Sequence, residues 1–302
     1  MNHIEELFQE NYSPGYYKLI DSTHPLSLYI GADDGGNKAI EYRGVFKPSR
    51  IRSSNVIGIK QYQKGQEERI VISLLDGSLL STFSSFCLDL VESTRDIEDS
   101  TKGYEMLVNR YYTWKKMFIA NRERLDEKKI MGLIGELLFL QNDMIPAYGK
   151  AVAISSWTGS EKTKKDFSVS DTWFETKAIN SGKDNVTISS FEQLDSNQVG
   201  HLIVYKLEKM SPEYNGITLN KLARSIYANL VVDELKDLFL QKLTEAGFVF
   251  DSYYEQFVYT ISSSDKYLVD NTFPCLRRSP IFAAISQVKY DLLLSKIEPY
   301  KE

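Results

Sequence analysis

The hydrophobic pattern of the chain changes near residue 100, and this change limits the folds that the 302 residues can adopt. Before it, short apolar runs alternate with the turn clusters ADDGGN, QKGQ and DG, as in antiparallel strands. After the polar segment ESTRDIEDSTKG, apolar residues recur with a helical period over about 104–121 and 126–142. Because a single core usually stops growing near this length, we expect a β-rich N-terminal domain over 1–100 and a second domain over 101–302. The predicted strands are SLYIG, KAIEYRGVF, NVIGIKQY, ERIVISLL and SLLSTFSSF.

The second domain mixes helices and strands. After the two helices, AVAISSW predicts a strand, DFSVS and WFETKAI predict a hairpin, SSFEQLDSN predicts a short polar helix, and HLIVYKLE predicts a further strand. From 126 onward the order is therefore helix, strand, strand, strand, helix, strand. Two helical runs, TLNKLARSIYANL and VVDELKDLFLQKLTEAG, and a β-rich end follow as a C-terminal α+β extension. The fold class expected is α/β (α+β).

Composition excludes several classes of protein. No apolar run is long enough to span a bilayer, and the start of the chain lacks the pattern of a secretory signal, so we expect a cytoplasmic location and no membrane partner. The two cysteines, Cys87 and Cys275, form no pair typical of a disulfide framework or a zinc site. The histidines lack ligand spacing, and no Walker or dinucleotide motif occurs.

The net charge of -5 is unusual for a protein that binds nucleic acid, since phosphates are normally met by clustered Lys and Arg. The window 122–183, however, carries ten basic and nine acidic residues. Three of these acids are assigned below to metal binding. The local charge therefore permits nucleic-acid binding without requiring it.

The helix IMGLIGELLFL is so apolar that it must be largely buried, and Glu136 lies on it beside the apolar face. An unpaired charge is costly in such a place, so a cationic partner is expected. Gly132 and Gly135 each lower the helix's stability by roughly 1 kcal/mol relative to alanine, which indicates that another backbone packs closely there. The alternative is a buried structural glutamate paired with Arg or Lys.

In the predicted hairpin, Glu175 and Lys177 project from one face, since side chains two apart share a face of a strand. If the turn centres between Asp171 and Thr172, then Asp166 opposes Lys177 and the three charges lie together. Carboxylates that converge repel one another, and a hard divalent cation such as Mg²⁺ relieves that repulsion. Such a set suits metal-assisted hydrolysis of a phosphodiester, with Lys177 orienting the attacking water or stabilising charge on the phosphate. Taken alone, a Glu-x-Lys strand is usually a solvated face.

The order of these residues resembles the PD-(D/E)XK nuclease superfamily, whose core is a helix, three strands, a helix and a strand. More narrowly, GLIGELLFL, WTG at 157–159, DF at Asp166, ETKA at Glu175 and ISSFEQL at 188 resemble a bacterial family known by this nuclease motif and encoded near restriction and phage-defence genes. The resemblance implies that Glu136, Asp166, Glu175 and Lys177 are the catalytic residues, and that the three acids hold Mg²⁺, with Mn²⁺ as a substitute. No proline precedes Asp166; Lys165 stands there instead.

The resemblance implies a DNA endonuclease of a restriction or phage-defence system, working with other defence subunits or as a homodimer. Ser190 and Gln193 are candidates for phosphate or metal-water contacts, although capping explains the serine equally well. Candidates for contacts to the nucleic-acid backbone are lysines 162, 164 and 165 and arginines 277 and 278. Of these, Lys165 is assigned to substrate binding. Trp157 is expected to pack in the core. The alternatives are a non-catalytic DNA-binding or assembly subunit with the same fold, and a nuclease that acts on RNA.

Overall fold

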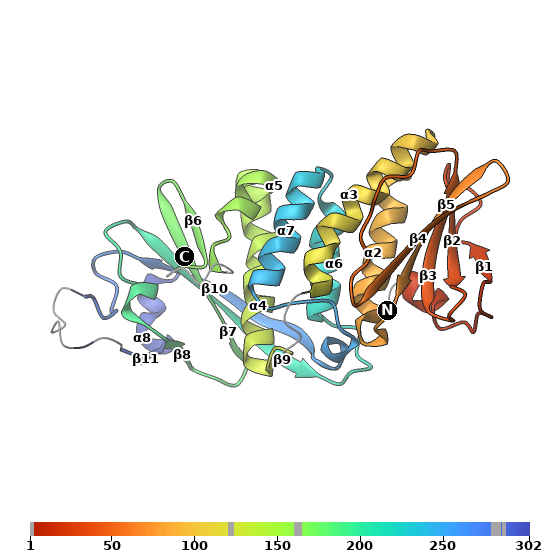
Figure 1. Ribbon diagram of the computed structural model, residues 1–302. Coiled ribbons are helices and arrows are strands. Elements are labelled where there is room, and N and C mark those ends of the chain that lie inside the picture. The colour runs from red at the N-terminus through yellow and green to blue at the C-terminus, as the bar shows by residue number, and fades with distance from the viewer. Residues whose placement is uncertain (1–2, 120–123, 160–164, 279–284, 286–287) are drawn as a thin grey trace. The chain divides into compact units, whose positions relative to one another are not determined.

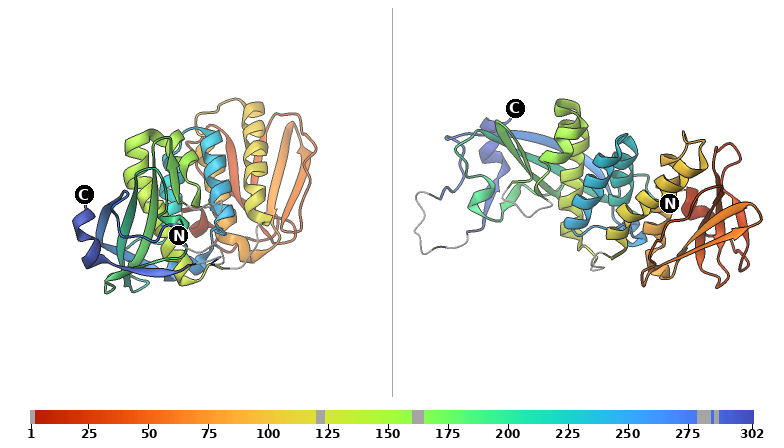
Figure 2. Two further views of the ribbon diagram at one scale, coloured as in Figure 1. Left: turned by 90° about the vertical axis from the view of Figure 1, so that its left-hand side faces the viewer. Right: turned by 45° about the horizontal axis from the view of Figure 1, so that its top comes forward.

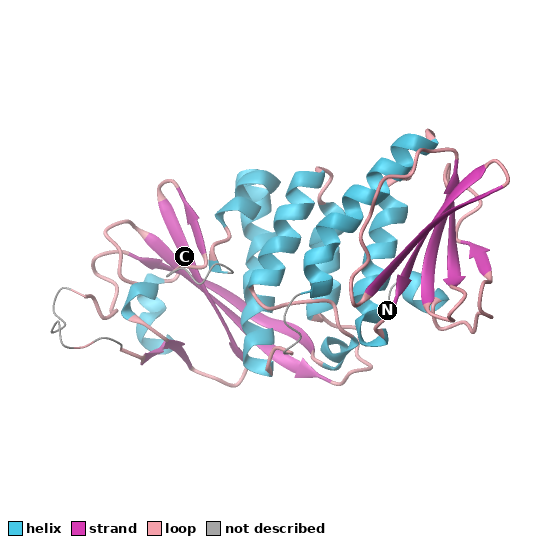
Figure 3. Cartoon of the chain, in the orientation of Figure 1, coloured by secondary structure: helices cyan, strands magenta, loops and turns pink. Residues whose placement is uncertain are grey.

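The computed structural model describes residues 3–119, 124–159, 165–278, 285 and 288–302. The chain forms two compact units, each containing helices and strands, so the molecule is of the mixed class that the pattern predicts (Figure 3). The first unit comprises Met1–Arg122 together with Val249–Ser252, and the second comprises Glu123–Phe248 and Tyr253–Glu302. None of the described helices combines the length and the apolar character needed to cross a bilayer.

The first unit contains an antiparallel sheet of five strands in the order β1-β2-β3-β5-β4 (Figure 1). Tight turns join neighbouring strands where the glycine-rich clusters predict them, and Gly36 and Gly65 adopt φ of +81° and +67° there. Such angles are accessible to glycine at little cost. The strands are β1 (Tyr17–Leu19), β2 (Ser27–Ala32), β3 (Lys38–Gly44), β4 (Ile57–Lys64) and β5 (Glu67–Leu74).

Helices cover one face of this sheet. They are α1 (His3–Leu7), α2 (Leu80–Ser93) and α3 (Ser100–Ile119). The strand predicted from SLLSTFSSF is wrong, because this run begins α2. Phe83, Phe86, Cys87 and Leu90 are fully buried, and their spacing of three, one and three residues fits one side of a helix. Asp76 caps the preceding 3-10 turn by accepting a hydrogen bond from Ser78 N.

The helix α3 belongs to the first unit, so the unit boundary differs from the boundary predicted near residue 100. Asp89 of α2 accepts hydrogen bonds from Arg110 Nε at 2.7 Å and from Trp114 Nε1 at 2.8 Å. The polar segment before α3 is thus a connection between two packed helices and not a linker between domains. The returning segment Val249–Ser252 adds to this core, since Phe250 packs on Trp114 and its carbonyl accepts a hydrogen bond from the buried Thr82.

The second unit contains a four-stranded sheet in the order β10-β9-β7-β6, in which β7 and β9 are parallel and the other pairs antiparallel. Helix α4 packs on β7 and β9, and α6 and α7 lie beside α4 and α5 (Figures 1 and 2). The strands are β6 (Phe167–Val169), β7 (Thr172–Asn180), β9 (Gly200–Met210) and β10 (Val258–Val269). The helices are α4 (Glu127–Phe139), α5 (Ile145–Ser156), α6 (Leu219–Asn229) and α7 (Asp233–Glu245).

The strand predicted from AVAISSW is wrong, since most of this run is the end of α5. A π-helical turn, Leu140–Met144, leads from α4 into α5, and α5 is kinked at Gly149, where φ is 74°. Only Trp157 forms a β-bridge, to Phe167. A short apolar run does not by itself distinguish a strand from a buried helix end.

A second, two-stranded sheet is formed by β8 (Asn185–Ile188) and β11 (Tyr290–Leu293), followed by α8 (Leu294–Ile297). The polar helix predicted at SSFEQLDSN is only the 3-10 turn Phe191–Gln193. The four-stranded sheet contains β6, β7 and β9, which are the strands predicted from DFSVS, WFETKAI and HLIVYKLE. Strand β8 was not predicted from the sequence, and it pairs with β11 in the separate sheet. A core of apolar side chains contributed by both sheets and α8 includes Trp173, Val186, Ile188, Leu202, Val204, Tyr267 and Leu292.

Candidate active site

Helix α4 presents Glu136 at the edge of its buried face. Asp126 caps the helix by accepting a hydrogen bond from Lys129 N at 2.9 Å. A Cβ added at Gly135 would lie 3.0 Å from Ala178 Cβ of β7, so the close packing predicted for this glycine is confirmed there. Gly132 instead faces open space, with nothing within 4 Å of such a Cβ. Glycine at 135 therefore lets α4 lie directly against the strand that carries Glu175 and Lys177.

The hairpin of β6 and β7 has a register two residues away from the predicted one. Val169 pairs with Thr172 and Phe167 with Phe174, so the turn is Ser170-Asp171. Asp166 lies just before β6, where its Oδ2 accepts hydrogen bonds from Thr176 N at 2.7 Å and Thr176 Oγ1 at 2.8 Å. Thr176 thus fixes the carboxylate at the point where the backbone pairing of the hairpin ends.

The segment after α5 brings Glu136 and Asp166 together. Trp157 is fully buried, and its Nε1 donates a hydrogen bond of 2.7 Å to Glu136 Oε2. The amides of Thr158 and Gly159 both donate to the carbonyl of Asp166, at 2.8 and 2.9 Å. A Cβ at Gly159 would lie 2.8 Å from Glu136 Oε2 and 3.0 Å from Asp166 Oδ1. Both carboxylates therefore approach this glycine so closely that a side chain there would collide with them.

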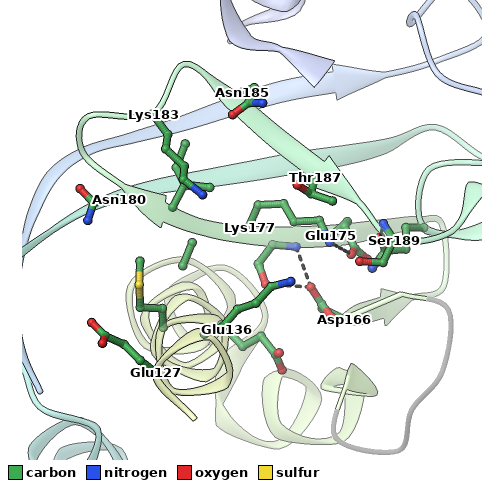
Figure 4. A pocket seen from close by; sticks show the side chains of 17 residues that line it. Glu127, Glu136, Asp166, Glu175, Lys177, Asn180, Lys183, Asn185, Thr187 and Ser189 are labelled. Atoms are coloured by element: carbon green, nitrogen blue, oxygen red, sulfur yellow. Dashed lines mark hydrogen bonds and ion pairs between the residues drawn. The ribbon is translucent and has the colours of Figure 1, made fainter. Parts of the chain in front are cut away.

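Glu175 and Lys177 extend from the same face of β7, as predicted. Lys177 Nζ donates to Glu175 Oε1 at 2.7 Å, and the Glu175 residue is only 1% exposed. With Glu136 and Asp166 they line one cavity of about 570 Å³ (Figure 4). The structure therefore brings together the four residues proposed as catalytic.

Burial dominates the electrostatics of the four groups. Burial, followed by the Asp166 carboxylate, raises the pKa of Glu136 well above its ordinary value and raises the pKa of Glu175 to about 8. Burial also raises the pKa of Asp166, although Lys177 and the bonds from Thr176 oppose it. Burial favours neutral Lys177, but Glu175 and Asp166 outweigh it and raise the pKa of that ammonium. The ionised forms of the three acids are therefore disfavoured, whereas the protonated form of Lys177 is favoured.

The donor chemistry of the cavity fits a hard divalent cation. Carboxylate oxygens are its preferred ligands, and a cation would relieve the repulsion that raises the pKa values of Glu136 and Glu175. In the described part of the chain, no group of three or more His, Cys, Asp or Glu side chains is already placed to hold a metal ion. The carboxylates of the cavity therefore fit a divalent cation by ligand type and by charge.

The residues predicted to bind substrate are only partly brought to this cavity. Gln193 lines it, and its Oε1 accepts a hydrogen bond from Ser189 N at 2.7 Å. Ser190 is the N-cap of the 3-10 turn, makes no side-chain capping bond, and is not among the residues that line the cavity. Lys165 Nζ donates to the carbonyls of Gln193 and Asp195 and lies 3.5 Å from the centroid of the Trp173 ring.

The other basic candidates lie apart from the cavity or outside the described residues. Lys162 and Lys164 lie outside the described residues. Arg277 pairs with Asp195 at 3.5 Å, and Arg278 Nη1 donates to the carbonyl of Ile285 at 2.8 Å. Neither arginine is among the lining residues.

Several residues of the site were not predicted from the sequence. The hydrogen bonds of Thr176 and Trp157 to the carboxylates depend on tertiary placement, which no local pattern reveals. The polar wall that β8 forms is different, because this strand alternates polar and buried residues. Asn185, Thr187 and the following Ser189 line the cavity, whereas Val186 and Ile188 are fully buried. This period of two was a usable signal.

Comparison with known proteins adds a family to this geometry. No curated protein and no solved structure matches the chain. A family model described as "Putative PD-(D/E)XK family member" (DUF4420) matches residues 5–295. That match covers both units and every residue of the cavity. The chain therefore belongs to this PD-(D/E)XK family.

Proposed function

We propose that the protein is a metal-dependent endonuclease that hydrolyses DNA phosphodiester bonds. The observation that carries the proposal is the convergence of Glu136, Asp166, Glu175 and Lys177, from one helix and one hairpin, on a single cavity. Three acids and one lysine provide the ligand type and the fixed positive charge that phosphodiester hydrolysis needs. The shared family supports the same reading.

Asp166, Glu175 and Glu136 would hold Mg²⁺, or Mn²⁺ in its place. When bound, the ion supplies Lewis acidity at the phosphate and lowers the pKa of a coordinated water. Thr176 holds the carboxylate of Asp166 in place, and Trp157 holds that of Glu136. Lys177, whose ammonium donates a hydrogen bond to Glu175, would stabilise negative charge on the phosphate or orient the attacking water.

The wall of Asn185, Thr187 and Ser189 supplies neutral hydrogen-bonding groups to the same cavity, and Lys128 and Lys183 add positive charge along its lining. Such groups suit the sugar-phosphate backbone, since contacts to phosphate position a nucleic acid without reading its sequence. We further propose a role in bacterial restriction or phage defence, alongside other subunits or as a homodimer. That role rests on the family resemblance of the motifs alone.

The test is cleavage of supercoiled and linear DNA by the full chain in Mg²⁺ or Mn²⁺, with EDTA as the metal-free control. Asp166→Asn and Lys177→Met are expected to lower the rate by at least about 100-fold, as for loss of a group that stabilises the transition state. The matched controls, Asp171→Asn in the hairpin turn and the exposed Lys296→Met, should cut like wild type.

Equal cutting by wild type and site variants would refute the proposal. DNA binding without cutting in either metal would favour the non-catalytic alternative. RNA of the same sequence is offered in parallel, so that preferential cutting of RNA would reassign the substrate.

A further inference from the structure

The sheet of the first unit has a second cavity, of about 470 Å³, on the face that the helices leave open. Strand β3 alternates between the two faces. Tyr42 points to the helices, where its hydroxyl donates to the carbonyl of Ser100 at 2.9 Å, whereas Glu41 and Arg43 line the cavity. This face is therefore not part of the apolar core of the unit.

Glu41 lines this cavity, and it is fully buried. It accepts hydrogen bonds from Arg43 Nε at 2.7 Å and from the Tyr62 hydroxyl at 3.0 Å, and Arg69 Nη1 lies 3.6 Å from it. The Arg43 guanidinium also lies 3.6 Å from the centroid of the Tyr29 ring. One carboxylate thus orients two guanidinium groups. Arg69 Nη2 also donates to Glu67 Oε2 at 3.2 Å, so the charges of Glu41, Glu67, Arg43 and Arg69 balance.

The unused hydrogen-bonding capacity of the cavity lies on the donor side. Arg69 Nε is buried and has no hydrogen-bond partner among the described residues. The acids at the rim are occupied: Asp33 Oδ1 accepts from the amides of Gly35 and Asn37, and Asp34 pairs with Lys60 at 2.6 Å. A ligand that satisfies this cavity must therefore bring acceptors.

We propose that this cavity binds a phosphate oxyanion through Arg69 and Arg43, with Lys64 at its exposed rim. A phosphate presents several strong acceptor oxygens, which the fixed donors of a guanidinium match well. Burial raises the pKa of Tyr62, so its hydroxyl remains protonated at neutral pH. The phosphate comes from a free nucleotide or from the backbone of a nucleic acid, and the two sources share the chemistry that the cavity recognises.

Binding is measured by calorimetry on the full chain in EDTA, with inorganic phosphate, a 5′-mononucleotide and a short single-stranded DNA as separate probes. Arg69→Gln is expected to weaken phosphate binding about tenfold, as for loss of one hydrogen bond between charged groups. Lys64→Gln should weaken it by about threefold, as for an exposed charge pair. Arg95→Gln is the matched control, because Arg95 lies in the same unit, pairs with Asp21 at 3.0 Å and does not line the cavity.

If Arg69→Gln weakens the binding of all three probes, the site accepts phosphate from either source. If wild type binds the DNA but neither small anion, and Arg69→Gln weakens the binding of the DNA, the phosphate comes from the nucleic-acid backbone. Absence of binding by wild type, or unchanged binding in both cavity variants, overturns the proposal. If Arg69→Gln does not fold, binding is measured on the double variant Glu41→Gln/Arg69→Gln, which removes the buried carboxylate and the guanidinium together. Lys177→Met must retain phosphate binding, which separates this site from the proposed nuclease site.

Discussion

Glu175 is an acid held where its ionised form is disfavoured. Its pKa is raised to about 8 from 4.5, mainly by burial and then by the Asp166 carboxylate, while Lys177 and Lys165 oppose the shift. A carboxyl that binds its proton more tightly in the folded state stabilises the fold below its unfolded pKa. That contribution is lost as pH rises from about 4.5 through about 8.

The first prediction concerns this pH dependence. In EDTA, the free energy of unfolding of the wild type should fall as pH rises across that window, and Glu175→Gln should show a shallower fall because it cannot ionise. Urea unfolding at several pH values measures the slope. Adding Mg²⁺ should flatten the slope of the wild type only, since a bound cation offsets the repulsion. A slope that Glu175→Gln leaves unchanged would contradict this assignment.

A second prediction uses two buried tryptophans that differ in their acceptors. Trp157 Nε1 donates to the Glu136 carboxylate at 2.7 Å, and Trp173 Nε1 donates to the neutral carbonyl of Gln198 at 3.1 Å. Trp157→Phe should destabilise the protein increasingly as pH rises and Glu136 ionises, by about 1.5–3 kcal/mol at most beyond the packing loss. Trp173→Phe should lower the free energy of unfolding by the same amount at every pH. Parallel pH profiles for the two variants in denaturant unfolding would argue against an ionised partner for Trp157.

At the scale of the element, the packing of α4 on β7 depends on one of its two glycines. Alanine at Gly132 meets open space and gains up to about 1 kcal/mol of helix propensity. Alanine at Gly135 meets Ala178 Cβ at 3.0 Å, on a strand held between two neighbours. Gly135→Ala should therefore be less stable than Gly132→Ala by about 1–3 kcal/mol. Thermal melting compares them; equal melting temperatures would mean that the strand yields.

Elements also show where sequence patterns suffice and where they fail. The helix of Glu136 was predictable from its long apolar period, and the strand of Glu175 and Lys177 from its aromatic and β-branched residues next to the turn formers Ser170 and Asp171. SLLSTFSSF and AVAISSW are short apolar runs, and a short run does not by itself distinguish a strand from a buried helix; most of both runs is helical. The hairpin register depended on which two residues form the turn, and Thr172, a β-branched residue, extends the strand instead of turning.

The four candidate site residues were predicted by order and type, but their mutual contacts were not. A cationic partner was expected for Glu136, and the structure provides the indole N–H of Trp157. Thr176 lies between Glu175 and Lys177 in the strand, yet it binds Asp166 through both its amide and its hydroxyl. These contacts arise where segments distant in sequence meet, which a periodic pattern does not encode.

At the scale of the whole molecule, each unit has its own buried core, and Phe250 counts with the first unit although it follows α7 in sequence. Phe250 is 2% exposed and its ring centroid lies 5.9 Å from that of Trp114. Phe250→Ala should cost about 3–5 kcal/mol. In calorimetry the loss should appear in the same transition that Leu90→Ala lowers, since Leu90 is fully buried in α2. A loss shared instead with Leu137→Ala of α4 would place Phe250 in the second unit's cooperative core.

The return of Val249–Ser252 to the first unit also sets an order of events during protein synthesis. When the ribosome has delivered the five strands and the two long helices, the socket beside Trp114 still lacks its ring, and Thr82 lacks the carbonyl that it binds. Both are translated only after Glu136, Asp166, Glu175 and Lys177. The first unit can therefore complete its core only after most of the second unit has been translated.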